Sequence, residues 1–484
     1  MAKFIFWGAW TITGLYLAAE VLTFLLIDYP FNYYEPEVVM EAWRLKEGLP
    51  IYLDPANGPL AGLYAPFSQI VGALFYWILP DKLIVFRLIS FLSLIGISVL
   101  AWRKSSSRNL LQLLFALTLV FIWHQKLYHF EIQAKPDSLS VLLVILSLLA
   151  LNRGLPHRQT LAFIAGGILT ALAAFTKQTM LFVIIPIALA LIIHRKWNPL
   201  LLYIAGTAVS IAALWLILPL WVGNHLYFYT LDLPGQFPIS IGKLVTGSYE
   251  LLGTFWMLPL LAIVYKKWKN GQWLFYDTMM LLALLFSWPV SVFTFAKGGG
   301  LPNAFQPFYM LLAVYLVSEI PLSNWLTHAR AHLALQNRIS FGYALAAIAV
   351  GFLLLDTAFV NPPGFITTMQ YRLRAHSNYQ ELAGQLRQAE GSLYVPMDNY
   401  LSLKAGKPIW RSQKNELDFS IGGVAPATSY RDVPLRHRNV VTVNTEDWRN
   451  SAGLEKKLKQ NSYTLKSSKK MNQGVTYNWW IKSN

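Results

Sequence analysis

Residues 4–27 of the chain read FIFWGAWTITGLYLAAEVLTFLLI, an apolar run that a single acidic residue, Glu20, interrupts. A helix that crosses a bilayer needs about 20 mostly apolar residues, so this stretch is long enough to span one. The run exceeds the apolar core of a signal peptide, and no small-residue cleavage site follows it. We therefore predict an uncleaved membrane anchor at the amino terminus.

The composition of the whole chain extends this prediction beyond the first span. Of 484 residues, 55% are apolar and only 13% are charged, about half the charged share of soluble proteins. So apolar a chain could not cover its surface as a soluble globule, and it is not disordered. The absence of cysteine excludes a disulfide-stapled scaffold, a thiolate metal site and a cysteine nucleophile.

Apolar runs predict an all-α membrane bundle of about eleven spans. Several runs are near or below the usual lower limit of about 17 residues. The three shortest cluster between 138 and 194, where kinked or partly buried helices are expected. The predicted spans cover about residues 4–27, 83–102, 110–127, 138–151, 161–175, 179–194, 200–222, 250–265, 273–296, 304–320 and 341–359.

Basic and acidic residues alternate between successive loops, which predicts the orientation. If the amino terminus is cytoplasmic, the inner loops carry Lys3, Arg103, Lys104, Arg108, Arg153, Arg158, Arg195, Lys196, Lys266, Lys267, Lys269, Arg330 and Arg338. The opposite loops carry Glu35, Glu37, Glu41, Glu47, Asp54, Asp81, Glu131, Asp137 and Asp232. This asymmetry predicts a multi-pass protein of the cytoplasmic membrane with its amino terminus inside. Orientation and anionic lipid then explain the net charge of +16 better than nucleic acid does.

The composition divides the chain into two domains, at 1–360 and 361–484. The second domain is polar, lacks a span-length apolar run, and begins near Pro362-Pro363-Gly364. Ser392–Pro396 and Val440–Asn444 read as short strands, and 377–389 and 451–460 read as helices. We expect a small α/β domain on the extracytoplasmic side of the membrane.

The loop between the first two confident spans, 28–82, is long for a connector, and long loops are often functional. It opens with Asn32-Tyr33-Tyr34-Glu35-Pro36-Glu37, and an amphipathic helix ending at Gly48 follows. Such a helix suits the membrane interface. A second apolar piece, from Tyr64-Ala65-Pro66 to Pro80, is expected to be interfacial or re-entrant. As a full span it would move the Arg103–Arg108 cluster to the outer face.

These motifs resemble the GT-C superfamily of membrane glycosyltransferases, and most closely the glycosyltransferase family 39-like enzymes related to protein O-mannosyltransferases and aminoarabinose transferases. Tyr34 stands where the first acid of the family's Asp-Glu pair is usual. The matching stretches are Tyr34-Glu35, Glu47-Gly48, Pro50-Ile51-Tyr52, Tyr64-Ala65-Pro66, Arg87, Lys135-Pro136-Asp137, Phe175-Thr176-Lys177-Gln178 and Lys297-Gly298-Gly299-Gly300-Leu301-Pro302-Asn303.

The resemblance implies transfer of a sugar, with inversion, from a polyprenyl-phosphate donor to a lipid, glycan or protein acceptor outside the membrane. It implies catalytic carboxylates at Glu35 as general base, Glu37 and Asp137. The implied donor-phosphate residues are Arg87, Lys135, Lys177, Lys297 and Asn303, and the implied substrate-binding residues are Tyr34 and Tyr64. Glu35 and Asp137 could hold Mg²⁺ or Mn²⁺, so metal use stays open.

Simpler structural roles remain open for the same residues. Glu35 could favour the dipole at a helix start, and the outer lysines could snorkel to the interface. Two other functions also remain open. One is a transporter or flippase of a lipid-linked sugar, although the sequence has no internal repeat. The other is a catalytically degenerate relative that binds the lipid-linked sugar, which the Tyr34 departure favours.

Overall fold

The computed structural model describes residues 2–32, 34–55, 60–79, 82–123, 126–127, 129–157, 160–254, 256–321, 362–408, 418, 420–421, 437–444, 450–472 and 475–483. The predicted span at 341–359 lies outside the described residues, as do Arg158, Arg330 and Arg338.

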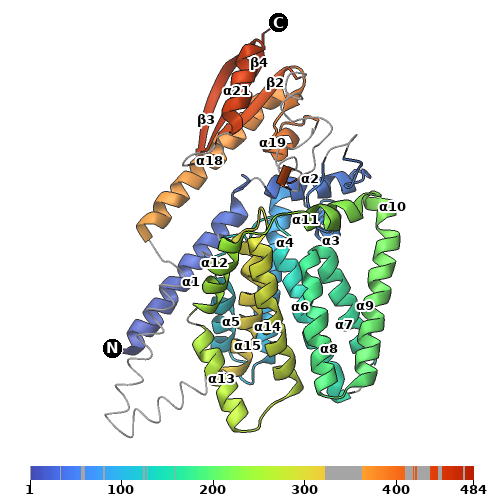
Figure 1. Ribbon diagram of the computed structural model, residues 1–484. Coiled ribbons are helices and arrows are strands. Elements are labelled where there is room, and N and C mark those ends of the chain that lie inside the picture. The colour runs from blue at the N-terminus through green and yellow to red at the C-terminus, as the bar shows by residue number, and fades with distance from the viewer. Residues whose placement is uncertain are drawn as a thin grey trace.

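The membrane part is a helical bundle whose helices run between two ends of the molecule, with the small sheet at one end (Figure 1). Its elements are α1 (Ala2–Leu26), α2 (Glu35–Lys46), α3 (Phe67–Phe75), α4 (Lys82–Lys104), α5 (Leu110–Phe121), α6 (Asp137–His157), α7 (Thr160–Thr176), η1 (Gln178–Val183), α8 (Ile184–Ile193), α9 (Trp197–Ile217), α10 (Pro219–Val222), η2 (Phe228–Asp232), α11 (Leu233–Gly235), α12 (Ile241–Leu252), α13 (Met257–Lys269), α14 (Phe275–Ala296), η3 (Pro302–Phe305) and α15 (Gln306–Glu319).

Four described helices are long and apolar enough to cross a membrane: Leu83–Lys104, Asp137–Leu155, Trp197–Val222 and Phe275–Ala296. Four shorter apolar helices lie at Gly14–Leu26, Leu110–Phe121, Thr160–Thr176 and Gln178–Ile193. The span expected at 250–265 is instead a bent pair, because α12 and α13 meet at 63°. The helix expected at 138–151 is longer than the sequence indicated, because α6 runs from Asp137 to His157.

Small and hydroxyl-bearing residues bring three helices of the bundle close together. On α7, Gly167 approaches the α9 backbone so closely that an added Cβ would lie 2.6 Å from Thr207 N. Ser147 Oγ of α6 donates to Gly166 O at 2.8 Å, and Thr170 bonds to Tyr203 Oη at 3.1 Å. Close packing and interhelical hydrogen bonds of this kind hold helices together where water provides no driving force.

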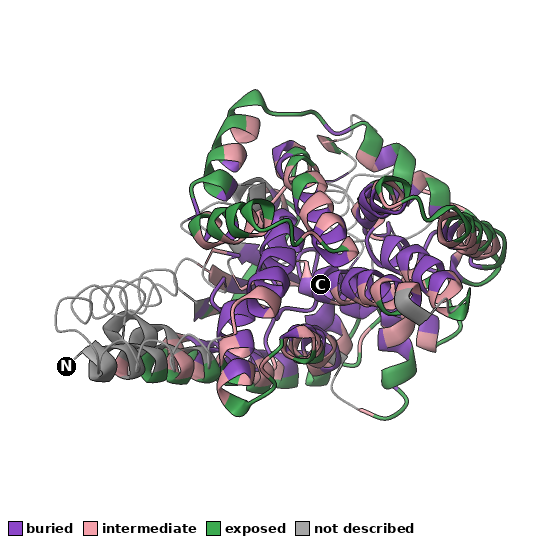
Figure 2. Ribbon diagram, turned by 90° about the horizontal axis from the view of Figure 1, so that it is seen from below, coloured by how far each residue is buried: buried purple, intermediate pink, exposed green. Residues whose placement is uncertain are grey.

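The outer faces of the bundle are apolar, as contact with lipid requires. Figure 2 shows buried residues concentrated between the helices and exposed residues on the rim. Several large apolar side chains of these helices are exposed, including Leu15, Leu22, Leu161, Leu216 and Leu285. Helix α9 is the clearest example, because only 11% of its most apolar window is buried.

A buried ion-pair cluster closes the end of the bundle that lies farther from the sheet. Asp277, in the first turn of α14, accepts a hydrogen bond from Leu274 N at 3.0 Å and pairs with Lys267 of α13. Lys267 also pairs with Glu319 of α15 at 2.8 Å. Three helices are therefore tied together by charges that are satisfied within the protein, which burial of charge requires.

Two short helices of the 28–82 loop lie at the other end, near the sheet (Figure 1). Pro36 occupies the first turn of α2, where its missing N–H removes no helical bond. Gly48 follows the helix with φ +73°, a conformation that glycine adopts without strain. Helix α3 has nine residues, too few to cross a bilayer, and it packs against α2.

The carboxyl-terminal region folds as a four-stranded sheet with a long helix on one side. It comprises α18 (Pro362–Gln388), β1 (Leu393–Tyr394), α19 (Asn399–Lys404), β2 (Asn439–Asn444), α21 (Asn450–Gln460), β3 (Tyr463–Asn472) and β4 (Val475–Lys482). The strand order is β1-β2-β4-β3, parallel only between β1 and β2. The predicted strands and helices are present, and the β3–β4 hairpin was not predicted.

Helix α18 joins this region to the first span through one polar face. Arg372 donates to Glu20 of α1 at 2.6 Å. One turn on, His376 Nδ1 accepts a hydrogen bond from Asp28 N at 3.1 Å, and Gln380 then donates to Asp28 Oδ2 at 3.1 Å. The spacing of four residues places these three side chains on one face of the helix. The acid inside the first apolar run is therefore paired, as a buried charge must be.

Asp398 makes the stability of the carboxyl-terminal region dependent on pH. Its carboxyl group accepts hydrogen bonds from Tyr379 at 2.8 Å and Tyr477 at 2.9 Å. Burial nevertheless raises the pKa of Asp398 to about 6, although both hydrogen bonds oppose the rise. The folded chain therefore keeps this proton between about pH 4 and pH 6, whereas the unfolded chain has lost it.

We expect the free energy of unfolding to fall by about 2 kcal/mol as the pH rises from 4 to 6, and to level off above pH 6. The sign follows because the unfolded state binds fewer protons in this window. Melting temperatures of the wild type and of Asp398→Asn, measured at both pH values, test this. The variant should lack the slope, and equal slopes would remove Asp398 as its source.

Candidate active site

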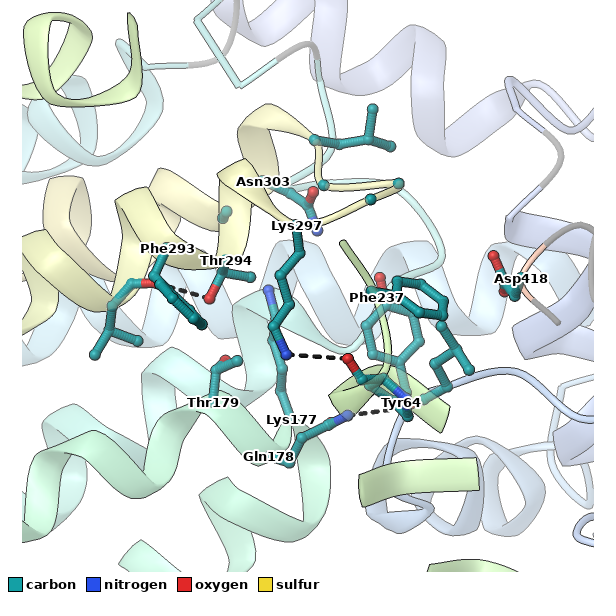
Figure 3. A pocket seen from close by; sticks show the side chains of 18 of the residues that line it. Tyr64, Lys177, Gln178, Thr179, Phe237, Phe293, Thr294, Lys297, Asn303 and Asp418 are labelled. Carbon is teal, nitrogen blue, oxygen red and sulfur yellow. Dashed lines mark hydrogen bonds between the residues drawn. The ribbon is translucent and has the colours of Figure 1, made fainter. Parts of the chain in front are cut away.

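A cavity of about 600 Å³ lies among the ends of the membrane helices that are nearer the sheet. Three chain segments that are distant in sequence supply most of its polar lining, and α14 supplies an apolar flank (Figure 3). The lining residues are Tyr34, Leu63, Tyr64, Lys177, Gln178, Thr179, Pro234, Phe237, Pro289, Val290, Phe293, Thr294, Lys297, Gly298, Gly299, Gly300, Leu301, Asn303, Ala304 and Asp418.

Asp137 lies directly behind the polar wall of this cavity. It begins α6, and its Oδ1 pairs with Lys177 and accepts a hydrogen bond from Asn303 Nδ2 at 3.0 Å. Its Oδ2 is buried and has no hydrogen-bond partner among the described residues. Buried polar atoms are nearly always hydrogen-bonded in folded proteins. Asp137 itself is not among the lining residues, but Oδ2 is an unused acceptor on a side chain that two lining residues, Lys177 and Asn303, hold in place.

Two lysines bring positive charge to the cavity from different elements (Figure 3). Lys177 lies between α7 and η1, where its extended backbone separates the two helices. Lys297 follows α14, and its Nζ donates to Pro234 O at 3.0 Å. Burial lowers the pKa of Lys297. Both ammonium groups face a partly desolvated space, where they attract an anion more strongly than in water.

Aromatic side chains complete the polar part of the site. Tyr34 and Tyr64 both line the cavity, and Lys135 lies behind Tyr34, with its ammonium 4.4 Å from the centre of that ring. Lys135 also lies 3.6 Å from the ring centre of Phe130. Burial raises the pKa of Tyr64 well above its usual value, and the nearby Asp137 carboxylate adds to the rise. Tyr64 therefore keeps its hydroxyl proton.

Glu35 and Arg87 do not line the cavity, and they form a closed pair. Glu35 accepts hydrogen bonds from Arg87 Nε at 2.9 Å and Nη2 at 2.7 Å, from Phe31 N at 2.8 Å and from Ala134 N at 2.8 Å. Arg87 also donates to the carbonyls of Phe24, Ile27 and Tyr29. All five N–H groups of its guanidinium are thus engaged. The base and phosphate roles expected of the two residues stay predictions, and in this structure their charged groups are bonded to each other.

Glu37 and the glycine turn at Gly298–Gly300 differ in whether they line the cavity. Glu37 is buried on α2 and is not among the cavity-lining residues. The turn Gly298–Gly300 lines the cavity, but Gly298 N donates to Pro238 O and Gly300 N donates to Lys297 O. Two of its three backbone N–H groups are therefore bonded within the protein, so the turn has few amides left to bind a phosphate.

Two further residues line the cavity although neither of them was proposed from the sequence as a site residue. Gln178 follows Lys177 and donates to Leu63 O at 2.8 Å and to Thr230 O at 3.0 Å, which joins η1 to the 28–82 loop and to η2. Asp418 comes from the carboxyl-terminal region. The motif around Lys177 already contained Gln178, whereas nothing in the sequence around Asp418 indicated a site.

The described residues do not assemble a divalent-cation site. No group of three or more His, Asp or Glu side chains able to hold a metal is found in the described part of the chain. Mg²⁺ prefers about six oxygen ligands, whereas Asp137 supplies one open carboxylate oxygen beside an ammonium group. Glu35, the other expected ligand, already has both oxygens engaged with Arg87.

The multi-span bundle, with two short helices, a lysine-lined cavity and a small α/β region at one end, is the architecture that the sequence resemblance implied. Comparisons with known proteins confirm the predicted resemblance to the GT-C superfamily of membrane glycosyltransferases and the predicted fold class. Residues 64–222 match the family model described as dolichyl-phosphate-mannose-protein mannosyltransferase. Curated protein sequences give no match.

Two solved structures are similar in fold to nearly the whole chain. The structure of ArnT from Cupriavidus metallidurans bound to undecaprenyl phosphate is 12% identical, has a TM-score of 0.58, and covers 97% of each chain. The same protein in the apo state is 13% identical, with a TM-score of 0.59, and covers 96% of this chain and 97% of that one. At these identities the match establishes the fold.

Proposed function

We propose that the chain is a membrane glycosyltransferase that moves a sugar from a polyprenyl-phosphate donor to an acceptor hydroxyl. The observation that carries the proposal is the buried Asp137, which is held by the cavity-lining residues Lys177 and Asn303 and whose Oδ2 has no hydrogen-bond partner among the described residues. The polyprenyl donor is supported by the matched family model and by the lipid phosphate bound in the similar ArnT structure.

In the proposed reaction the acceptor oxygen bonds to the anomeric carbon while the bond from that carbon to the phosphate oxygen breaks. The acceptor proton passes to Asp137 Oδ2, which replaces Glu35 as our candidate general base. The bonding electrons leave with the polyprenyl phosphate. Lys177 and Lys297 face the negative charge that develops on this leaving group. Attack opposite the leaving phosphate inverts the anomeric centre.

We further propose that the cavity opens on the extracytoplasmic side. Basic residues at the ends of α4, α8 and α13, such as Lys104, Arg195 and Lys269, lie at the end of the bundle that is farther from the sheet (Figure 1). Loops that carry such residues usually stay in the cytoplasm. On this basis the cavity and the sheet share the outer side.

Binding of lipid phosphate provides a direct test of the cationic cavity. Purified protein in nanodiscs should bind undecaprenyl phosphate, and Lys297→Met should weaken that binding at least about tenfold, because a charge-assisted hydrogen bond is lost. Lys46→Met is the matched control, since Lys46 lies on α2 and is not among the cavity-lining residues. Equal affinities in all three proteins would contradict a phosphate site at Lys297.

Transfer itself is tested with labelled polyprenyl-phosphate sugars and candidate acceptors. The expected result is a labelled acceptor together with released polyprenyl phosphate. Movement of the intact donor across the bilayer without bond cleavage would instead support a flippase. Tight donor binding without either outcome would support a degenerate relative.

A further inference from the structure

Among the described residues of the carboxyl-terminal region, Asp418 lines the cavity. It follows α19 and precedes β2 in sequence, yet it lines the cavity together with Tyr34, Tyr64 and Lys177. Only 5% of its surface is exposed. The cavity wall is therefore built from both parts of the chain.

A glycine contact independently places this segment against the membrane part. The position of an added Cβ on Gly298 lies 2.6 Å from Ile421 Cγ2 and 3.3 Å from Pro238 Cδ. A side chain at 298 would displace Ile421, so the missing side chain lets Ile421 approach the turn that follows Lys297. Asp418 and Ile421, three residues apart, thus both contact the site.

The charges of the cavity wall are separated. Lys177 and Lys297 lie on one side, and Asp418 lies beyond Tyr64 and Phe237 on the other (Figure 3). Among the described lining residues Asp418 is the acidic side chain. Its charge also contributes to the raised pKa of Tyr64, after burial and the charges of Asp137 and Tyr34. A ligand whose phosphate meets the lysines would therefore present a different group to Asp418.

We propose that Asp418 is a specificity-determining residue that accepts hydrogen bonds from hydroxyl or amino groups of the transferred sugar and excludes acidic sugars. This inference rests on the proposed function. An ionised carboxylate is an acceptor-only group with two oxygens, so it suits neighbouring hydroxyls or an ammonium group. A second carboxylate facing it in a desolvated space would be repelled strongly. Discrimination of this kind depends on the repulsive element as much as on the attractive one.

The test uses two donors that differ only at the sixth carbon of the sugar. Undecaprenyl-phosphate glucose carries a hydroxymethyl group there, and undecaprenyl-phosphate glucuronic acid carries a carboxylate. Affinities of the full-length protein in nanodiscs are measured for both donors and for bare undecaprenyl phosphate. The proteins are the wild type, Asp418→Asn, Asp418→Ala and the control Glu390→Gln, whose exposed carboxylate lies in the same region of the chain.

The wild type and Glu390→Gln should bind the glucose donor at least about tenfold more tightly than the glucuronic acid donor. In Asp418→Asn the affinities for the glucose and glucuronic acid donors should differ by no more than about threefold. Asp418→Ala should bind the glucose donor about tenfold more weakly than the wild type does. Bare undecaprenyl phosphate should bind all four proteins equally, which also shows that each variant is folded. An unchanged ratio in Asp418→Asn, with bare lipid still bound, would overturn this inference alone. Failure of the wild type to bind any of the lipids would overturn the proposed function with it.

Discussion

Asp137→Asn is expected to lower the rate of sugar transfer at least about a hundredfold while undecaprenyl phosphate still binds. The reduction is the lower end of the contribution of a general base, because an amide cannot accept the acceptor's proton. Asparagine keeps the shape of the side chain, so the lysine-lined wall remains in place. Single-turnover rates with saturating donor separate this loss from weaker binding.

Asp277→Asn provides a matched control for that experiment. Asp277 is also a buried acid paired with a lysine, Lys267, at the opposite end of α14. Nineteen residues separate it from Ala296, next to the cavity, which is about 29 Å along the helix. Both variants should lose stability, but only Asp137→Asn should lose turnover per folded molecule. Wild-type turnover in Asp137→Asn would exclude this residue as the base.

Glu35→Gln is expected to destabilise the fold by about 3–5 kcal/mol, the usual effect of removing one partner of a buried ion pair. The Arg87 guanidinium would keep its carbonyl partners but lose its counter-charge. Arg87→Met should produce a loss of similar size. The double variant should lose clearly less than the sum, because the two residues act as one unit.

Thermal and denaturant unfolding in detergent measures these losses, and the transfer assay distinguishes the two roles of Glu35. If Glu35 is structural, turnover per folded molecule in Glu35→Gln stays within a few-fold of the wild type. A variant with wild-type stability and a hundredfold slower turnover would return Glu35 to the role of base.

The pairing of Glu35 with Arg87 is a contact that the sequence did not predict. Both residues were assigned to the site because they lie in motifs near the outer ends of predicted spans. The two residues lie 52 positions apart in the sequence, and the fold brings them together so that they neutralise each other. Motif position predicts the level of a residue in the membrane, and only the packing of α2 against α4 decides which side chains face a cavity.

Asp137 and Lys177 show the opposite outcome. Each was predicted separately, from a short motif at a helix end. The structure pairs them, and Asn303 joins them from a third segment. A sequence cannot indicate such a cluster, because its members lie 40 and 166 residues apart and the contacts arise from helix packing.

The sequence alone determined that this chain is a helical membrane protein with a polar carboxyl-terminal domain, because lipid requires long apolar helices and charge asymmetry between loops. It also predicted which polar residues lie near the proposed outer face. Only the tertiary structure decided which of them are locked in ion pairs, which line the cavity, and that Asp418 joins them. Burial and partner choice depend on contacts between distant segments, which local pattern does not encode.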